Sequence, residues 1–287
     1  MVFPSVMALP LLIVLAAGLY YIYNEVMQYM SKSLVRNKVV VITDAVSGVG
    51  NECAHLFHKG GARLILCGDN WDKLESLYDS LINEADPSET FAPKLVILDF
   101  SDMESMEDVT TEMVDSYGCV DVLICNSSMK LKAPVQSISL ELDRNIMDIN
   151  YFGPTTLTKG GVACFQQKDR CVLSLHQSDA ASKHAVQAFF DCLRAEVEEY
   201  GITVSTISHT FIDSTVPSSP EKHLAHGVRP SVLADEIMRT VNRKRKEVVL
   251  SHPIPRVAVH LRSLLPSFLF AVLGAGVKDS VLAEQME

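Results

Sequence analysis

Apolar runs alternate with amphipathic segments along most of this chain, and the alternation predicts a parallel sheet. Seven short runs are strand-like, and most of them are continuously apolar, which is typical of strands buried on both faces. They are Val39–Thr43, Arg63–Cys67, Lys94–Asp99, Val120–Cys125, Cys171–Leu175, Thr203–Ile207 and Glu247–Leu250. The segments between them carry helical patterns. Strand–helix repetition at this pitch predicts βαβ units in one α/β domain, a doubly wound parallel sheet.

Two of the helical segments have a clear apolar face. The first follows Asp102, a capping candidate, and its apolar positions are Met106, Val109, Met113, Val114 and Tyr117. The second has its apolar positions at Ala181, Ala185, Phe189 and Cys192. Such spacing indicates helices that pack against a sheet. The basic run Arg243–Lys246 is expected to end a further helix in water rather than to bind nucleic acid.

The N-terminal segment predicts a membrane anchor. Val2–Tyr23 contains no charged residue, and its 22 positions would span about 33 Å as a helix, enough for a bilayer core. Lys32, Arg36 and Lys38 follow, which places the rest of the chain in the cytosol. The alternative is a cleaved signal near Ala16–Gly18, which would make the protein secreted.

These patterns divide the chain into an anchor or signal at 1–24, a linker at 25–36, a globular domain at 37–280 and a tail at 281–287. A second apolar stretch, Leu264–Val277, is short for a membrane span. We expect it to be a packing helix, with membrane contact as the alternative.

Charge and cysteine content exclude several classes of partner. The formal net charge of the 287 residues is −10, which disfavours nucleic acid as a partner because phosphate binding needs a basic face. The seven cysteines form no CxxC motif and lie mainly in apolar runs. They are expected to be reduced core residues, and no metal site is predicted.

A glycine-containing turn joins the first predicted strand to the first helix. It runs from Thr43 to Gly50 and reads TDAVSGVG. Small residues there let the backbone approach a pyrophosphate and let helix N–H groups point at it. A glycine pair at this place in a βαβ unit indicates a dinucleotide site.

Four motifs, in order, resemble those of the short-chain dehydrogenase/reductase family. The turn resembles the family's TGxxxGxG fingerprint, and Cys125–Ser128 stands where the family has NNAG. Asn150 stands at the place of its structural and catalytic asparagine, and Ser182–His184 matches the end of its YxxSK motif. The resemblance covers about residues 35–280. It implies a Rossmann-type fold, a nicotinamide cofactor and oxidoreductase chemistry.

The resemblance also implies which residues hold the cofactor. In the turn they are Thr43, Ser47, Gly48, Val49 and Gly50, with Ser47 and Val49 touching the cofactor. Beyond the turn they are Asp69, Asp99 at the adenine end, Asn126, Lys183 at the nicotinamide ribose, and Ser214 at the threonine place of the family's PGxVxT loop.

Two aspartates bear on the choice of cofactor. Relatives that use NADP often have arginine at the place of Asp69, where a carboxylate would repel a 2′-phosphate and accept a ribose hydroxyl. Asp69 therefore favours NAD over NADP, although a plain turn would also carry an aspartate.

Asp44 replaces the first fingerprint glycine, and a carboxylate about 5 Å from a phosphate charge would cost roughly 3 kcal/mol at a dielectric near 20. A member of the family also has aspartate there, which implies that the side chain turns into solvent.

The proton-transfer group of the family is absent. Moving a hydride between an alcohol and NAD requires a group that gives or takes the hydroxyl proton. In the family this is a tyrosine four residues before the lysine, and here that position is Asp179. A carboxylate beside Lys183 is ionised at neutral pH and is a weak base, so about 10²–10⁴ in rate would be lost. The catalytic positions of the family fall on Asn150, Asp179 and Lys183. Without the tyrosine, Asn150 and Lys183 suit cofactor binding and helix support better than proton transfer.

The family's serine is missing as well. It belongs roughly a dozen residues before the tyrosine, and the chain is shortened between the fifth strand and Asp179 by about that much. Ser174 and Ser178 are possible substitutes, but Ser178 is better explained as a helix N-cap. His176 is a potential proton carrier, although a histidine at a strand end is more often structural.

Three functions therefore remain open. The first is an NAD(H)-dependent oxidoreductase for a lipophilic alcohol or carbonyl, such as a retinoid or steroid, at an endoplasmic or sarcoplasmic reticulum membrane. The second is a catalytically impaired, cofactor-binding membrane protein with a regulatory or scaffold role. The third, a secreted domain, depends on cleavage. By analogy with the family, the helix Ser182–Tyr200 is a homodimer contact.

Overall fold

The computed structural model describes residues 17–21, 34–84, 86, 88, 90–126, 129, 138–163, 170–177, 181–209, 228–250 and 267. Its elements, in chain order, are β1 (Val39–Ile42), α2 (Gly48–Lys59), β2 (Arg63–Gly68), α3 (Trp71–Glu84), β3 (Lys94–Ile97), α4 (Met106–Tyr117), β4 (Val122–Cys125), α5 (Leu140–Met147), η2 (Asp148–Phe152), α6 (Gly153–Ala163), β5 (Arg170–Gln177), α7 (Ala181–Val197), η3 (Glu198–Tyr200), β6 (Ile202–His209), α8 (Pro230–Arg243) and β7 (Glu247–Leu250).

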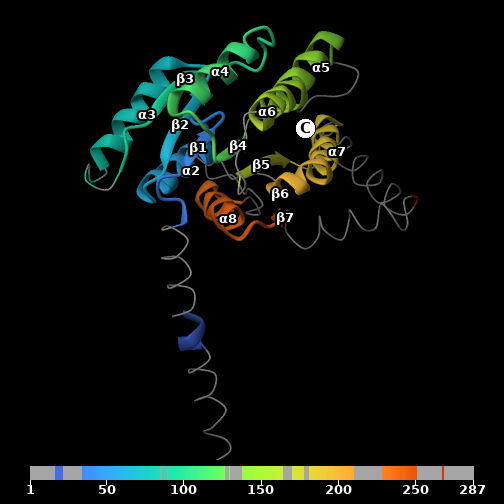
Figure 1. The fold of residues 1–287 in the computed structure, drawn as a ribbon. Helices are drawn as coiled ribbons and strands as arrows, with labels where there is room; N and C mark the ends of the chain where they lie inside the picture. The colour runs from blue at the N-terminus through green and yellow to red at the C-terminus, as the bar shows by residue number, and fades with distance from the viewer. Residues whose placement is uncertain are drawn as a thin grey trace, which may run out of the picture.

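The strands form a seven-stranded sheet in the order β3-β2-β1-β4-β5-β6-β7, and every neighbouring pair is parallel (Figure 1). This is the doubly wound α/β sheet that the apolar runs predict, so the fold class is confirmed. All seven strands lie where the sequence places them, with bounds that differ by at most two residues. The order reverses between β1 and β4, which makes the carboxyl ends of these two strands the expected ligand edge.

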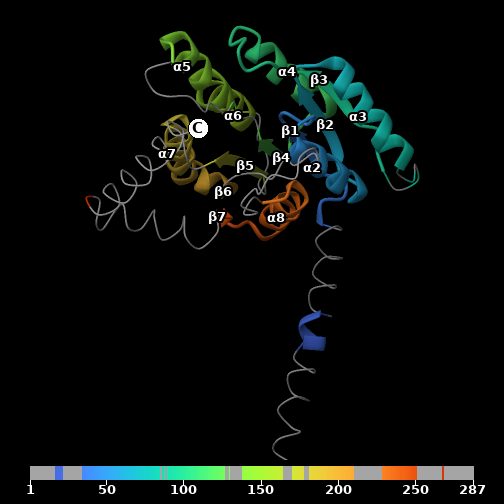
Figure 2. The same cartoon turned by 180° about the vertical axis from the view of Figure 1, so that it is seen from behind.

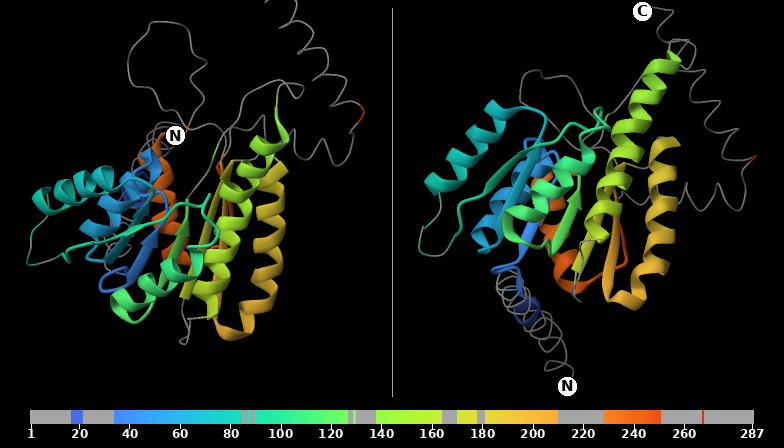
Figure 3. Two further views of the ribbon diagram at one scale, coloured as in Figure 1. Left: turned by 90° about the horizontal axis from the view of Figure 1, so that it is seen from above. Right: turned by 45° about the horizontal axis from the view of Figure 1, so that its top comes forward.

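Alternate side chains of the strands enter two cores on opposite faces of the sheet. Val40 and Ile42 of β1 pack with residues of α2, α3 and α8. Val39 and Val41 pack on the other face with residues of α4, α6 and α7. The α2 and α8 helices lie together beneath the sheet in Figures 1 and 2, and α6 and α7 cover the opposite face in Figure 3. Burial on both faces explains why the strands read as continuous apolar runs.

The observed ends of the helices can be compared with the predicted ones. α4 begins at Met106 with Ser105 as its N-cap residue, so the prediction that Asp102 caps this helix is wrong. The Asp102 carboxylate instead accepts the N–H groups of Glu104 and Ser105 and holds the preceding turn. α8 ends at Arg243 in a mostly exposed basic segment, as predicted. α7 matches the second predicted helix and continues into the 3₁₀ turn η3.

The predicted membrane segments fall largely outside the described residues. Of the 1–24 segment, only 17–21 are described, as a helical turn whose Leu19, Tyr20 and Tyr21 side chains are exposed. Of Leu264–Val277, only Ser267 is described. Within the described ranges, no helix combines the length and apolarity that crossing a bilayer requires.

Candidate functional site

The carboxyl ends of β1 and β4 meet where the strand order reverses. The chain leaves β1 towards β2 on one side, while β4 lies on the other side of β1. Loops that diverge from such a point leave a crevice in which ligands bind. Thr43 follows β1 and Asn126 follows β4. The structure therefore brings these two predicted cofactor residues to one edge of the sheet.

Asn126 holds the turn that follows β1. Its backbone N–H donates to Thr43 Oγ1 (2.9 Å), and its side-chain Nδ2 donates to Ser47 Oγ (2.8 Å) and to the Asp44 carbonyl (3.3 Å). Thr43 is fully buried. The side chains of Thr43 and Asn126 are thus engaged within the protein, where they fix the backbone of the turn.

Ser47 is the N-cap residue of α2. Its Oγ accepts the N–H of Gly50 (3.2 Å) and donates to the Asp44 carbonyl (2.8 Å). The first N–H groups of a helix have no acceptor inside the helix. Because Ser47 satisfies that of Gly50, the intrahelical pattern leaves the N–H groups of Gly48 and Val49 at the positive end of the helix. Such an end binds anions.

Gly50 is required where α2 approaches the turn. A Cβ at this position would lie 2.2 Å from the Asp44 carbonyl oxygen and 2.8 Å from Ala45 Cα, closer than real Cβ contacts occur. At Gly48 a Cβ would meet only the Pro230 ring, at an ordinary 3.5 Å. Of the two glycines in the predicted motif, only Gly50 is therefore required by the packing of the turn.

A cavity of about 170 Å³ lies beside the turn. Three of its lining residues are carboxylates from three different elements: Asp44 after β1, Asp69 after β2 and Asp99 after β3. The rest of the lining consists of Gly68, Leu98, Phe100, Met129 and Ile149. Asp99 Oδ1 accepts the N–H and hydroxyl of Ser101 at 2.8 and 2.7 Å. The predicted Asp69 and Asp99 therefore lie at one site.

Asp44 does not turn away into solvent, so that expectation is wrong. The residue is partly buried and lines the cavity with Asp69. Its backbone is left-handed, with φ 48°, a conformation natural for the glycine that the family has here. Burial, reinforced by the Asp69 charge, raises the pKa of Asp44 to about 6, while the Ser47 hydrogen bond and the Lys73 charge lower it only in part.

Asn150 joins the segment after β4 to α7. It lies in the π-helical turn η2 and is 1% exposed. Its Oδ1 accepts the Met129 N–H (2.7 Å), and its Nδ2 donates to the Met129 carbonyl (2.9 Å) and to Ser182 Oγ (3.1 Å). Lys183, also buried, follows Ser182 on α7. Sequence reasoning missed the Asn150–Ser182 bond, although Ser182 stands inside the matched YxxSK motif.

Other predicted site residues lie outside the described residues or inside the sheet. Asp179, Ser178 and Ser214 are outside the described residues. Ser174 is 2% exposed in β5, between Cys125 of β4 and Thr206 of β6. Its hydroxyl therefore lies inside the sheet, which disfavours Ser174 as the missing serine. His176 belongs to β5, where its backbone pairs with Ser208.

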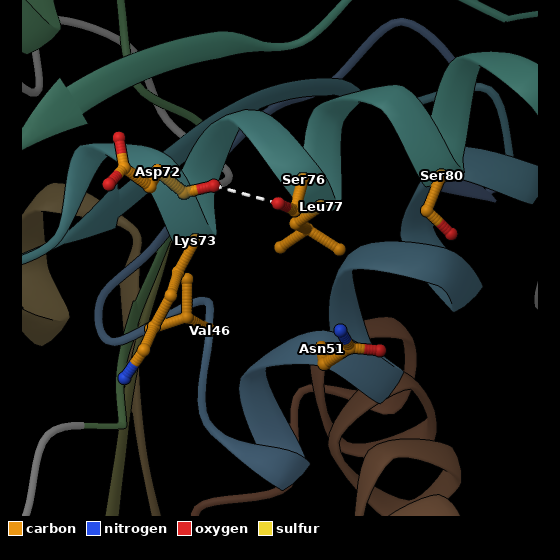
Figure 4. Close-up of a pocket in the computed structure, with 7 residues that line it drawn as sticks. All are labelled: Val46, Asn51, Asp72, Lys73, Ser76, Leu77 and Ser80. Atoms are coloured by element: carbon orange, nitrogen blue, oxygen red, sulfur yellow. Dashed lines mark hydrogen bonds between the residues drawn. The ribbon is translucent and has the colours of Figure 1, made fainter.

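A second cavity, of about 330 Å³, lies between α2 and α3. Figure 4 shows the Lys73 side chain running from α3 past Val46 of the turn. The remaining lining residues are Asn51, Asp72, Ser76, Leu77 and Ser80. The cavity is lined by these two helices and by Val46 of the turn, and none of its described lining residues is a predicted catalytic residue.

Most of the described cysteines are buried in the core. The six cysteines within the described ranges are free thiols. Burial raises the pKa of Cys125 to about 12 and raises those of Cys53 and Cys67 further, which fits inert core thiols. In the part of the chain that the structure describes, no three potential metal ligands come together.

Comparison with known proteins decides the family. The family model for short chain dehydrogenases matches residues 38–172. Dehydrogenase/reductase SDR family member 7C-A of Danio rerio is 57% identical over 324 aligned residues, which cover 100% of both chains. Member 7C of Mus musculus is 51% identical over 302 residues, covering 96% of this chain and 97% of the relative. This chain belongs to the short-chain dehydrogenase/reductase family. By membership it is an oxidoreductase similar to member 7C.

Solved structures of the family share the fold. An alcohol dehydrogenase from Thermococcus sibiricus, complexed with 5-hydroxy-NADP, matches with a TM-score of 0.66 and 20% identity, over 75% of this chain and 97% of that one. A metagenomic short-chain oxidoreductase in complex with NADP matches with a TM-score of 0.63 and 17% identity over the same shares of the two chains. NAD(P) is thus the cofactor type that this family typically uses.

The residues present fit a nicotinamide dinucleotide. The N–H groups of Gly48 and Val49 at the α2 N-terminus suit a pyrophosphate. Asp69, exposed after β2, suits a ribose hydroxyl. Asp44 is the exception, because an ionised carboxyl there repels a dinucleotide.

Proposed function

We propose that this chain binds NAD(H) at the carboxyl edge of β1 and β4. The observation that carries the proposal is the turn from Thr43 to Gly50. Asn126 and Ser47 hold its backbone, and the open helical N–H groups of α2 follow it. A preorganised site loses little conformational entropy when it binds an anion, which favours affinity.

Asp69 supports a preference for NAD over NADP. Its carboxylate lines the cavity beside the turn, where a 2′-phosphate would meet a like charge. At about 5 Å and a dielectric near 20, that repulsion amounts to roughly 3 kcal/mol, or about two decades in affinity. The NADP complexes among the solved family members carry no weight against this preference, since their identity to this chain is below 25%.

We further propose a reaction class, the oxidation of a lipophilic, retinol-like alcohol or the reduction of its carbonyl. The bound cofactor would accept or supply the hydride. Asn150 would hold the segment after β4 against α7, and Lys183 would add positive charge on the first turn of that helix. The proton at the substrate oxygen would need a group at or near position 179, where the sequence has aspartate.

A catalytically impaired, cofactor-binding role is the second candidate, and specific observations favour it. Asp179 replaces the family's tyrosine, and Ser174 is buried inside β5. The alignment with member 7C-A runs over 324 positions, although this chain has 287 residues. The relative thus has residues for which this chain has no counterpart. Such a protein would sense or store cofactor without turnover.

Binding and turnover can be measured separately. Trp71 is the only tryptophan and stands at the start of α3, close to Asp69, so energy transfer from Trp71 would report NADH binding. Retinol oxidation with NAD would then be followed for the full chain and for Asp179→Tyr. We expect saturable NADH binding by both and turnover at least about 10²-fold faster in the variant.

Three outcomes separate the candidates. Retinol oxidation by the unaltered chain at the rate of Asp179→Tyr would exclude the catalytically impaired, cofactor-binding role. Binding without turnover, together with an active Asp179→Tyr variant, would establish that the lost tyrosine limits this chain. Absence of NADH binding in both proteins would reject both functions and leave an α/β scaffold.

The membrane and partner proposals rest on the sequence. We propose that residues 1–24 anchor the protein in an endoplasmic or sarcoplasmic reticulum membrane with the domain in the cytosol. Protease added to intact microsomes should then digest the domain, and protection would contradict this topology.

We also propose a homodimer through the helix Ser182–Tyr200. Sedimentation of the detergent-purified chain as a monomer at micromolar concentration would contradict it.

A further inference from the structure

The turn holds Asp44 at a position that is unfavourable for an ionised carboxyl. Its backbone is left-handed, with φ 48°, a conformation that aspartate and asparagine adopt more readily than most residues with a side chain. Its carbonyl accepts hydrogen bonds from Ser47 and Asn126, so the turn is fixed in this conformation. Its side chain lies in the cavity beside the α2 N-terminus, where the proposed function places a dinucleotide.

The charges that face Asp44 come from three elements. Asp69, after β2, shares the cavity and disfavours ionisation of Asp44. Asp99, after β3, lines the same cavity. Lys73 on α3 opposes them, and Figure 4 shows its side chain extending past Val46 of the turn. The net effect raises the pKa of Asp44, because burial and the Asp69 charge together outweigh the Lys73 charge and the Ser47 hydrogen bond.

We propose that Asp44 determines the affinity of this site for dinucleotides by taking up a proton when one binds. The inference rests on the proposed function, since it assumes that NAD(H) binds at this turn. A neutral carboxyl leaves Asp69 and Asp99 as the charged acids of the cavity and removes the negative charge on the turn itself. The site would therefore accept a pyrophosphate despite carrying aspartate in place of the fingerprint's first glycine.

The linkage has a definite direction. The free protein has an Asp44 pKa of about 6. A bound pyrophosphate adds negative charge and raises this pKa further. Below the free pKa, Asp44 is already neutral and binding takes up no proton. Between the free and bound values each cofactor molecule brings up to one proton, so the Kd rises about tenfold per pH unit.

Calorimetry and fluorescence test this together on the full chain in detergent. NADH is titrated at pH 7 in phosphate and in Tris, whose different ionisation enthalpies report proton uptake. The Kd from Trp71 energy transfer is then followed from pH 5.5 to 8. The test variant is Asp44→Asn, because asparagine is neutral and tolerates a left-handed backbone. The control is Asp79→Asn, which removes the same charge from an exposed position of α3.

We expect the unaltered chain and Asp79→Asn to take up close to one proton at pH 7 and to lose at least tenfold in affinity between pH 6 and 8. Asp44→Asn should take up none and bind NADH with a nearly constant Kd. If NADH binds without proton uptake, or Asp44→Asn keeps the original pH profile, the inference is overturned while the proposed function stands. Absence of NADH binding at every pH overturns the proposed function and the inference with it. Should Asp44→Asn fold poorly, Asp44→Gly restores the family's residue and serves in its place.

Discussion

The carboxyl of Asp44 makes the stability of the fold depend on pH. Its pKa is about 6 in the folded protein against a usual 3.8, so its acid form favours folding. This contribution is fully present below pH 3.8 and is lost as the pH rises through 6. Above that range the ionised carboxyl costs about 3 kcal/mol.

Asp44→Asn should therefore raise the free energy of unfolding by about 3 kcal/mol at pH 7, and by much less at pH 4. Urea denaturation of both proteins at the two pH values would measure the difference. An equal effect at pH 4 and pH 7 would contradict the raised pKa.

Gly50 offers a steric test of the turn. In Gly50→Ala the new methyl group would lie 2.2 Å from the Asp44 carbonyl oxygen, so α2 or the turn must shift. We expect a loss of about 3 kcal/mol in unfolding free energy and a clear loss of NADH affinity. Gly48→Ala is the control for stability alone, because its methyl would meet only the Pro230 ring at 3.5 Å. Equal losses of unfolding free energy in the two variants would argue against this packing.

The sequence predicted which single residues come together at the candidate site better than it predicted what their side chains contact. The motif predicted Thr43, Ser47 and Asn126 as cofactor residues, and the structure brings the three together at the carboxyl ends of β1 and β4. Their side chains bond to one another, which a linear motif does not reveal, since the bonds join β1 to β4 across the sheet. The position of Asp44 in the cavity was missed for the same reason, because Asp69 and Lys73 reach it from β2 and α3.

At the scale of elements, Asn150 couples α7 to the segment after β4. Asn150→Ala would leave the partly buried Met129 N–H and carbonyl without these partners, at a cost of about 1–2 kcal/mol. Amide exchange at Met129 and urea denaturation would measure the loss. Asn145→Ala is the matched control, since its amide only reaches Met129 Sδ at 3.8 Å. A similar cost in both variants would contradict a special role for Asn150.

The elements themselves followed closely from the apolar pattern. Strands such as β1 and β4 are buried on both faces, so their sequences are continuously apolar and easily located. Details that depend on tertiary contacts were not predictable. The π-helical turn η2 and the Ser105 cap of α4 have no periodic signal, because they arise where Asn150 meets α7 and where Asp102 holds a turn.

At the scale of the whole molecule, the two edges of the sheet have different tasks. The carboxyl edge carries the turn, the carboxylates and Asn126. At the amino edge, Arg170 begins β5 and pairs with Asp121, which also accepts the Val39 N–H. This pair ties together the starts of β1, β4 and β5, far along the strands from the proposed site.

Arg170→Met should therefore separate stability from binding. Arg170 is 4% exposed, so removing its charge leaves the Asp121 carboxylate poorly compensated, at a cost of about 3–5 kcal/mol. The double variant Arg170→Met, Asp121→Asn should cost less than Arg170→Met alone, because no unpaired charge remains. Well below the melting temperature, both should bind NADH with the original Kd, because neither residue touches the turn. A changed Kd in a folded variant would mean that strain passes along β1 and β4 from one edge to the other, and the site could then no longer be explained from the carboxyl edge alone.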